Sequence, residues 1–150
     1  MPKITPFLWY DSKAEEAAKF YCSIFKNSKI VKVDRDGKKA MGVTFRLDGL
    51  ELIAFNGGPH FKFTHAISLF VHCKTQLEVD RLWEKLSKGG EKGQCGWLKD
   101  KYGLSWQIIP SILRDLLRHK NPVKSERAFK AMMQMTKIDI KALKRAVDQK

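Results

Sequence analysis

The strongest constraint on this chain is a repeated order of elements. β-Branched and aromatic residues at 4–10 predict a strand, and Ser12 with Glu15 then forms S-K-A-E, the pattern of a capping box at a helix start. The same order returns with an alternating strand at 64–73 and T-Q-L-E from Thr75. Neither unit alone could bury a sheet face, so we predict an internal duplication in which two sheets share a core.

Helical and hairpin patterns complete both units. Apolar residues follow Ser12 at helical spacing, and Asp48-Gly49 is a strong hairpin signal between two strands. In the second unit, helical spacing recurs at Val79, Leu82, Trp83 and Leu86, whereas only two of the expected four strands are strongly indicated. If 64–73 is one strand, alternation puts His72 on the opposite face from His65.

The pattern changes to helix alone after Pro110. Ser125 is a candidate cap for a Met-rich helix, and Thr136–Asp139 indicates another helix start. Residues 111–150 hold 11 Lys/Arg against 4 Asp/Glu, and we interpret these charges as solvated helix faces. We therefore predict a domain at 1–110, with modules at about 1–59 and 60–110, and a basic helical extension at 111–150.

The location of the protein is expected to be cytoplasmic. The start, MPKITPFLWYD, lacks a signal-peptide pattern, and no apolar run is long enough to span a bilayer, so no membrane partner is expected. Three cysteines at wide spacings, Cys22, Cys73 and Cys95, match neither a disulfide framework nor a metal knuckle. We expect them to be reduced thiols.

Three segments carry a family resemblance. They are PFLWYDSKAEEAAKFYCSIF, FNGGPHFKFTHAISLFV and GGEKGQCGWLKDKYGLSWQIIP, and the tail AFKAMMQMTKIDIKALKRA adds to them. The chain resembles the PhnB-like, 3-demethylubiquinone-9 3-methyltransferase-like branch of the vicinal oxygen chelate superfamily. The resemblance implies an α+β fold of paired βαβββ modules, as in glyoxalase/bleomycin resistance proteins, and a homodimer. Members include lyases, isomerases and non-catalytic sequestering proteins, so it leaves open whether this chain is an enzyme.

Metal-using members of the superfamily take two ligands from each module. The matching places here are His65 and Gln107 in the second module, and Ile4/Thr5 and Ile53/Ala54 in the first. One imidazole and one neutral amide cannot hold a divalent ion firmly. We therefore expect no metal and no cofactor.

Two alternative functions are weighed against small-molecule binding. Methyl transfer, which the family label suggests, commonly uses a Gly-rich loop between strand and helix, and no glycine stands at that point here. Non-specific nucleic-acid binding through the basic tail is the other alternative, but the tail carries no recognised reading motif. We do not expect nucleic acid as a partner.

The candidate site residues follow from these considerations. Polar residues at the positions of His65 and Gln107 face the cavity in the superfamily, so both are predicted to bind a small-molecule ligand, with His65 as the candidate acid or base. Trp9 and Phe55 are predicted to line the cavity from the first module. Cys95, between small neighbours, is a further candidate contact whose sulfur is approachable.

Overall fold

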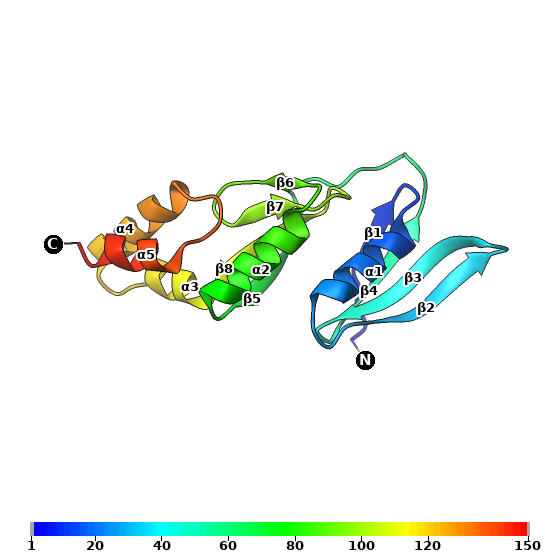
Figure 1. The fold of residues 1–150 in the computed structure, drawn as a ribbon, viewed down its shortest axis with the longest axis horizontal. Coiled ribbons are helices and arrows are strands. Elements are labelled where there is room, and N and C mark those ends of the chain that lie inside the picture. Colours follow the sequence, from blue (N-terminus) through cyan, green and yellow to red (C-terminus); the bar gives the residue numbers. More distant parts are fainter. Residues whose placement is uncertain (1, 150) are drawn as a thin grey trace. The chain divides into compact units, whose positions relative to one another are not determined.

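The chain divides into two compact units in the computed structural model, which describes residues 2–149. The first unit ends at Phe63 and the second begins at Thr64. Each unit contains one four-stranded sheet, and the two sheets have the same strand order (Figure 1). The predicted duplication within an α+β fold is therefore confirmed.

The first unit has the order β1-β4-β3-β2 across its sheet. Strand β1 (Phe7–Tyr10) runs parallel to β4 (Leu50–Asn56), and β3 (Lys39–Leu47) pairs antiparallel with both β4 and β2 (Lys29–Asp36). Helix α1 (Ala14–Ile24) contacts β2, β3 and β4. One face of this sheet is thereby covered.

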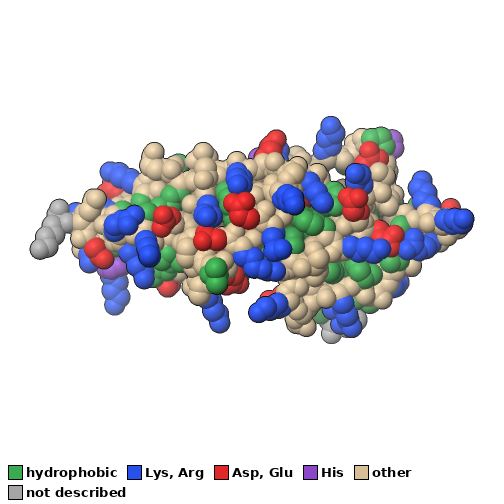
Figure 2. Space-filling view, in the orientation of Figure 1, with side chains coloured by type: hydrophobic (Ala, Val, Ile, Leu, Met, Phe, Trp, Pro, Cys, Tyr) green, Lys and Arg blue, Asp and Glu red, His purple; other side chains and the backbone are tan. Residues whose placement is uncertain are grey.

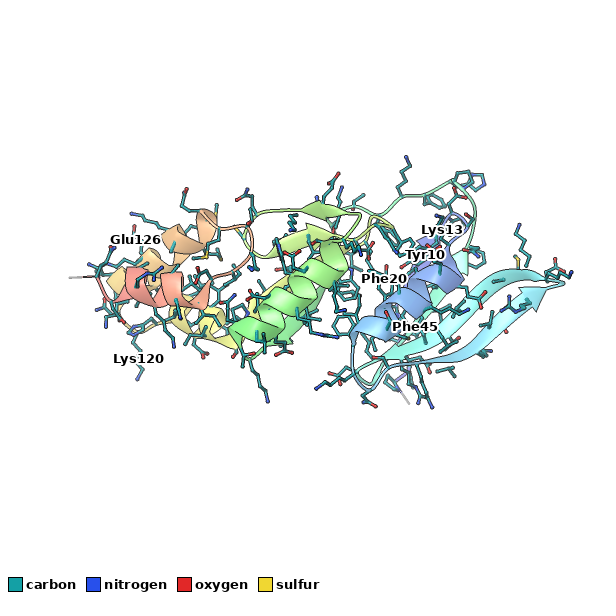
Figure 3. All side chains as sticks on the ribbon, in the orientation of Figure 1. Tyr10, Lys13, Phe20, Phe45, Lys120 and Glu126 are labelled. Atoms are coloured by element: carbon teal, nitrogen blue, oxygen red, sulfur yellow. The ribbon has the colours of Figure 1, made fainter. Side chains whose placement is uncertain are left out.

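The core of the first unit lies between this sheet and α1. The Tyr10 and Tyr21 hydroxyls are 2.9 Å apart, and the Tyr21 ring stacks on Phe45. Figure 3 labels Tyr10 and Phe45 in the first unit. Every second residue of the strands points the same way, which puts buried side chains on one face and the alternate residues on the other. The buried strand residues are Leu8, Tyr10, Val43, Phe45, Leu47, Leu52 and Ala54.

The predicted capping box at Ser12 is wrong. Helix α1 begins at Ala14, whose amide donates to the Asn56 side-chain oxygen at 2.8 Å. Glu15 instead accepts a hydrogen bond from Arg35 at 2.7 Å, which lowers the pKa of that carboxyl. A tertiary contact thus replaces the local cap, which sequence spacing alone cannot reveal.

The predicted hairpin at Asp48-Gly49 is confirmed between β3 and β4. Both residues have left-handed backbones, with φ of 47° and 88°. Two consecutive positive φ values define the type I′ turn, whose twist matches the flanking strands.

The second unit has the order β5-β8-β7-β6. Strand β5 (Ser68–Cys73) runs parallel to β8 (Ser105–Pro110), and β7 (Trp97–Lys99) pairs antiparallel with β8 and with the two-residue β6 (Glu91–Lys92). Helix α2 (Gln76–Ser87) contacts β5, β7 and β8. Buried side chains fill the space between helix and sheet: Val79, Leu82, Trp83, Leu86, Leu98, Trp106 and Ile108.

The second predicted cap, at Thr75, is confirmed. The Thr75 hydroxyl accepts from the Glu78 amide at 3.2 Å, and the Glu78 carboxylate accepts from the Lys74 amide at 3.0 Å. Both ends of the T-Q-L-E motif therefore satisfy free amides at the start of α2.

Three helices follow the second sheet: α3 (Ser111–Leu117), α4 (Pro122–Met133) and α5 (Ile140–Val147). The predicted cap at Ser125 is wrong, because α4 begins at Pro122 and the Asn121 side chain caps it. The three helices form a core with Ile109 of β8. It consists of Ile109, Leu113, Ile138 and Leu143, with Leu116, Leu117, Ala131, Met132 and Met135 packed against it. Two of the tail methionines thus fill a core.

Polar contacts attach these helices to α2. The Gln76 side chain donates to the Ile138 carbonyl at 2.9 Å and accepts from the Ile140 amide at 2.8 Å. Lys137 pairs with Asp80 at 2.9 Å. Among residues 2–149 no helix has both the length and the apolar character needed to cross a bilayer.

Candidate functional site

Four polar side chains gather on the face of the second sheet that α2 leaves uncovered. Because β5 and β8 are parallel, with Ser68 opposite Ser105 and Phe70 opposite Gln107, alternation puts Ser68, Ser105 and Gln107 on one face. His65, in the turn before β5, joins them through its contact with Ser105. Their face is opposite to that of Trp106 and Ile108, which are buried. We call His65, Ser68, Ser105 and Gln107 the polar row.

Two hydrogen bonds hold the polar row together. His65 Nδ1 lies 3.0 Å from the Ser105 hydroxyl, and the Gln107 amide nitrogen donates to the Ser68 hydroxyl at 3.0 Å. Ser105 is fully buried, whereas His65 is exposed and its ring meets the edge of Trp97. Within residues 2–149, His65 Nε2 and the Gln107 amide oxygen have no hydrogen-bond partner, so both are free to meet a ligand.

The histidine geometry differs from the sequence expectation. β5 begins at Ser68, not at residue 64, and His65 lies in the turn before it. The alternation that separated His65 from His72 therefore does not apply. His72 lies opposite Ile109, in phase with Ser68, and its ring contacts Phe70. Both histidines thus belong to the same face of this sheet.

A buried carboxylate positions the start of β8. Asp100 accepts from the amides of Tyr102 at 2.8 Å and Leu104 at 3.1 Å, and its other oxygen accepts from the Trp106 indole at 2.9 Å. The D-K-Y-G-L-S-W run is therefore a turn closed by its own aspartate. Because Gln107 follows directly, this turn also sets where the polar row lies on the sheet.

The end of the polar face nearest the C-terminal helices carries a cation. The Arg114 guanidinium, from α3, lies over the Phe70 ring at 5.7 Å from its centre. Phe70 is the cross-strand partner of Gln107. Sequence reasoning missed Ser68, Ser105 and Arg114, because the parallel register of β5 and β8 and the docking of α3 cannot be read from local patterns.

The first sheet has an aromatic patch on the face that α1 leaves uncovered. We define this aromatic patch as Phe7, Trp9, Phe55 and Phe61. The Trp9 ring meets Phe55 and Phe61 edge-on at 5.2 and 5.0 Å, and Phe7 meets Phe55 at 5.4 Å. The Trp9 indole donates to the Gly58 carbonyl at 2.9 Å. The predicted residues Trp9 and Phe55 are therefore in contact, with Phe61 added from a loop.

Cys95 contacts α4 and the segment that follows it. Its amide donates to the Met135 carbonyl at 2.8 Å, and its sulfur lies 3.8 Å from that of Met133. Of the other thiols, Cys73 is buried, and burial with the nearby Glu78 raises its pKa to about 12. Burial also raises the pKa of Cys22. Neither of these two thiols is suited to act as a nucleophile.

The metal that many superfamily members use does not fit the donor groups found here. In each unit taken alone, the described residues bring no three His, Cys, Asp or Glu side chains together. On the uncovered face of the first sheet, Phe7 and Ile53 stand opposite each other in β1 and β4. A phenyl ring and an aliphatic chain cannot ligate, so we derive no step through a metal.

Comparison with known proteins identifies the family of this chain. The family model described as 3-demethylubiquinone-9 3-methyltransferase matches residues 2–109. A putative 3-demethylubiquinone-9 3-methyltransferase, PhnB protein, from Bacillus cereus is 36% identical, and the match covers 73% of this chain and 100% of that one with a TM-score of 0.69. No curated protein matches at a significant level.

Two more distant structures share the fold alone. A fosfomycin resistance protein from Listeria monocytogenes, in complex with Mn(II) and sulfate, is 18% identical over 71% of this chain and 90% of that one, with a TM-score of 0.54. A glyoxylase/bleomycin resistance protein/dioxygenase domain from Frankia is 13% identical over 84% and 98%, with a TM-score of 0.51. The chain therefore belongs to the 3-demethylubiquinone-9 3-methyltransferase family, whose PhnB-like members have the fold of the vicinal oxygen chelate superfamily.

Proposed function

We propose that this protein binds a small neutral molecule carrying a hydroxyl or carbonyl group on the polar row, without a metal. The observation that carries the proposal is the pair of free polar atoms, His65 Nε2 and the Gln107 amide oxygen, on one face of the second sheet. The amide oxygen accepts, so a ligand hydroxyl is its complement. The imidazole nitrogen accepts or donates according to which ring nitrogen carries the proton.

The surroundings of these atoms support a flat ligand. Trp97 and Phe70 flank Gln107 on the neighbouring strands, so an aromatic ring can stack beside its amide. The aromatic patch of the first unit presents the same chemistry, and Phe7 and Phe61 there are 55% and 66% exposed. Few polar groups among apolar side chains is the usual make-up of a small-molecule site.

His65 also gives the site a route to catalysis. An exposed imidazole whose other nitrogen is held by Ser105 can exchange a proton with a bound hydroxyl through Nε2. Proton transfer of this kind is the step expected of a lyase- or isomerase-type enzyme. Turnover of a bound ligand separates an enzyme from a sequestering protein.

The proposal is tested with neutral probes. Hydroquinone and acetophenone, titrated by calorimetry, supply a hydroxyl and a carbonyl on an aromatic ring. Leaving one buried polar partner unpaired costs about 1–3 kcal/mol. His65→Ala should therefore weaken the binding of both probes, and Gln107→Ala the binding of hydroquinone, about ten- to a hundredfold.

Matched controls are available in exposed loops. His60→Ala and Gln94→Ala remove the same groups from exposed positions outside the polar row and should leave the affinity unchanged. If His65→Ala and Gln107→Ala bind both probes like the wild type, the polar row is structural and the proposal fails.

Neither alternative function gains support from the site. The connection between β1 and α1 holds no glycine, and the first amide of α1 already donates to the Asn56 side chain. This connection therefore offers no Gly-rich loop to bind a methyl donor. In the tail, Lys and Arg side chains spread over α4 and α5 (Figure 2), and Phe129 is the single aromatic residue of 111–150. Titration with S-adenosylmethionine, expected to give no heat, tests the first alternative.

We also propose a cytoplasmic homodimer. The three free cysteines suit a reducing compartment. Phe129 and Met133 stand one turn apart on α4, 51% and 48% exposed, which provides apolar surface for self-association. Sedimentation that finds a monomer at micromolar concentration would contradict the dimer.

A further inference from the structure

The first unit contains a pocket that the proposed function does not use. It has a volume of about 590 Å³ and lies where β2, β3 and β4 meet the segment before β1. Apolar walls come from Ile4 and Leu50, and the polar lining includes Lys29, Arg46 and Glu51. A volume of this size accommodates a small metabolite.

A row of three charged residues crosses the sheet inside this pocket. Lys29 of β2 is the cross-strand partner of Arg46 of β3, and Arg46 is the partner of Glu51 of β4. Directly opposed residues have their side chains on the same face. The row therefore consists of two cations, Lys29 and Arg46, and one anion, Glu51, with one positive charge in excess.

The excess charge is not neutralised by the protein. Arg46 Nε lies 3.6 Å from the Glu51 carboxylate, and their side chains are 40% and 29% exposed. Lys29 has no ion-pair partner among the described residues. Two like charges placed directly opposite each other destabilise a sheet, and an anion bound between them would remove that penalty.

The pocket wall is held in place by the adjacent hairpin. The Ser28 hydroxyl accepts from the Asp48 amide at 3.1 Å, which ties the start of β2 to the Asp48-Gly49 turn. Ser28 and Gly49 both line the pocket. Lys29 and Leu50 directly follow Ser28 and Gly49 in the chain. The same hydrogen bond therefore fixes the positions of both residues in the pocket wall.

We propose that this pocket binds a small organic oxyanion, a carboxylate or a phosphate, between Lys29 and Arg46. The apolar body of the ligand lies against Ile4 and Leu50. Beyond the Nε that faces Glu51, the guanidinium offers two further nitrogens with four N–H donors, in the fork geometry that suits oxyanions. This site is distinct in residues and in ligand charge from the polar row.

The test uses pentanoate and inorganic phosphate as probes at low salt, followed by amide chemical shifts of residues 27–29 and 49–51. Lys29→Gln should weaken binding about tenfold, because it removes one charge-assisted contact. Lys39→Gln makes the same charge change at the other end of the β2–β3 hairpin and should leave the affinity unchanged. Glu51→Gln should tighten binding, because it frees Arg46 from its intramolecular partner.

The outcomes separate the possibilities. Tighter binding of pentanoate identifies an organic acid with an apolar body, and tighter binding of phosphate identifies a phosphate ester. If neither probe shifts these amides, or if Lys29→Gln and Lys39→Gln weaken binding equally, the site does not exist. Because the probes for the polar row are neutral, failure there and failure here are told apart.

Discussion

At the scale of single residues, Gly57 shows how a backbone position shapes the aromatic patch. A Cβ added at Gly57 would overlap the Trp9 indole ring, so only glycine lets that ring lie against the chain. The backbone of Gly57 is not in the left-handed region, and the restriction is therefore steric alone. The position of Trp9 beside Phe55 therefore depends on Gly57, a residue of another segment.

We therefore expect Gly57→Ala to displace Trp9. The indole should lose its bond to the Gly58 carbonyl, and overpacking should lower the free energy of unfolding by about 1–3 kcal/mol. The fluorine resonance of 5-fluorotryptophan at position 9 should shift, as should the unfolding midpoint. Gly42→Ala is the control, since its Cβ meets only the Ala54 carbonyl oxygen at an ordinary 3.8 Å. An unmoved Trp9 resonance in Gly57→Ala would refute the argument.

The residue scale also shows what the sequence could reveal about the site. The family resemblance and the residue types at the matching positions identified His65, Gln107, Trp9 and Phe55 as candidates. They did not identify Ser68 and Ser105, whose role depends on the register of two parallel strands more than 30 positions apart. Whether any of these residues binds a ligand stays a prediction that the polar-row variants test.

At the scale of elements, local signals succeeded where the contacts are local. The Thr75 cap and the Asp48-Gly49 turn close within a few residues, so sequence spacing determines them. The cap of α1 comes from Asn56, 42 positions away from Ala14, and no spacing rule contains it. Strands β6 and β7 are two and three residues long and are too short to leave a pattern.

Element docking carries a pH dependence that can be measured. A hydrogen bond from Gln76, followed by the interaction with Lys137, lowers the pKa of Asp80. A carboxyl with a lowered folded-state pKa stabilises the folded contact at every pH above its unfolded value. That contribution is lost as pH falls through the lowered pKa. The attachment of the C-terminal helices to α2 should therefore weaken in acid.

The Ile140 amide reports this attachment, because it donates to Gln76. Its proton shift should titrate with an apparent pKa below that of an ordinary aspartate. Asp80→Asn should abolish the titration, and Lys137→Gln should move its midpoint upward. A titration that persists unchanged in Asp80→Asn would assign the effect to another group.

At the scale of the whole molecule, duplication gives each unit a core of its own. The first core lies between α1 and its sheet. The second has two parts: the side chains between α2 and its sheet, and the Ile109 cluster that joins β8 to the C-terminal helices. The sequence predicted the two modules because each repeats one order of elements. It could not show that 111–149 completes the second core, because Ile109 and Ile138 meet only through tertiary packing.

Two matched cavities test whether these cores unfold as separate units. Leu143 in the second core and Leu52 in the first are both fully buried, so each Leu→Ala change should lower the stability of its own core by about 2–5 kcal/mol. In hydrogen exchange, Leu143→Ala should accelerate the amides of β7 and β8 and spare those of β3 and β4, and Leu52→Ala should do the reverse. Such a crossed pattern requires each core to open on its own. If both cores opened together, either substitution would lower the free energy of opening for the amides of both sheets. If both variants accelerate the two sheets by the same factor, the chain unfolds as one cooperative body, and the repeat is a feature of its architecture but not of its energetics.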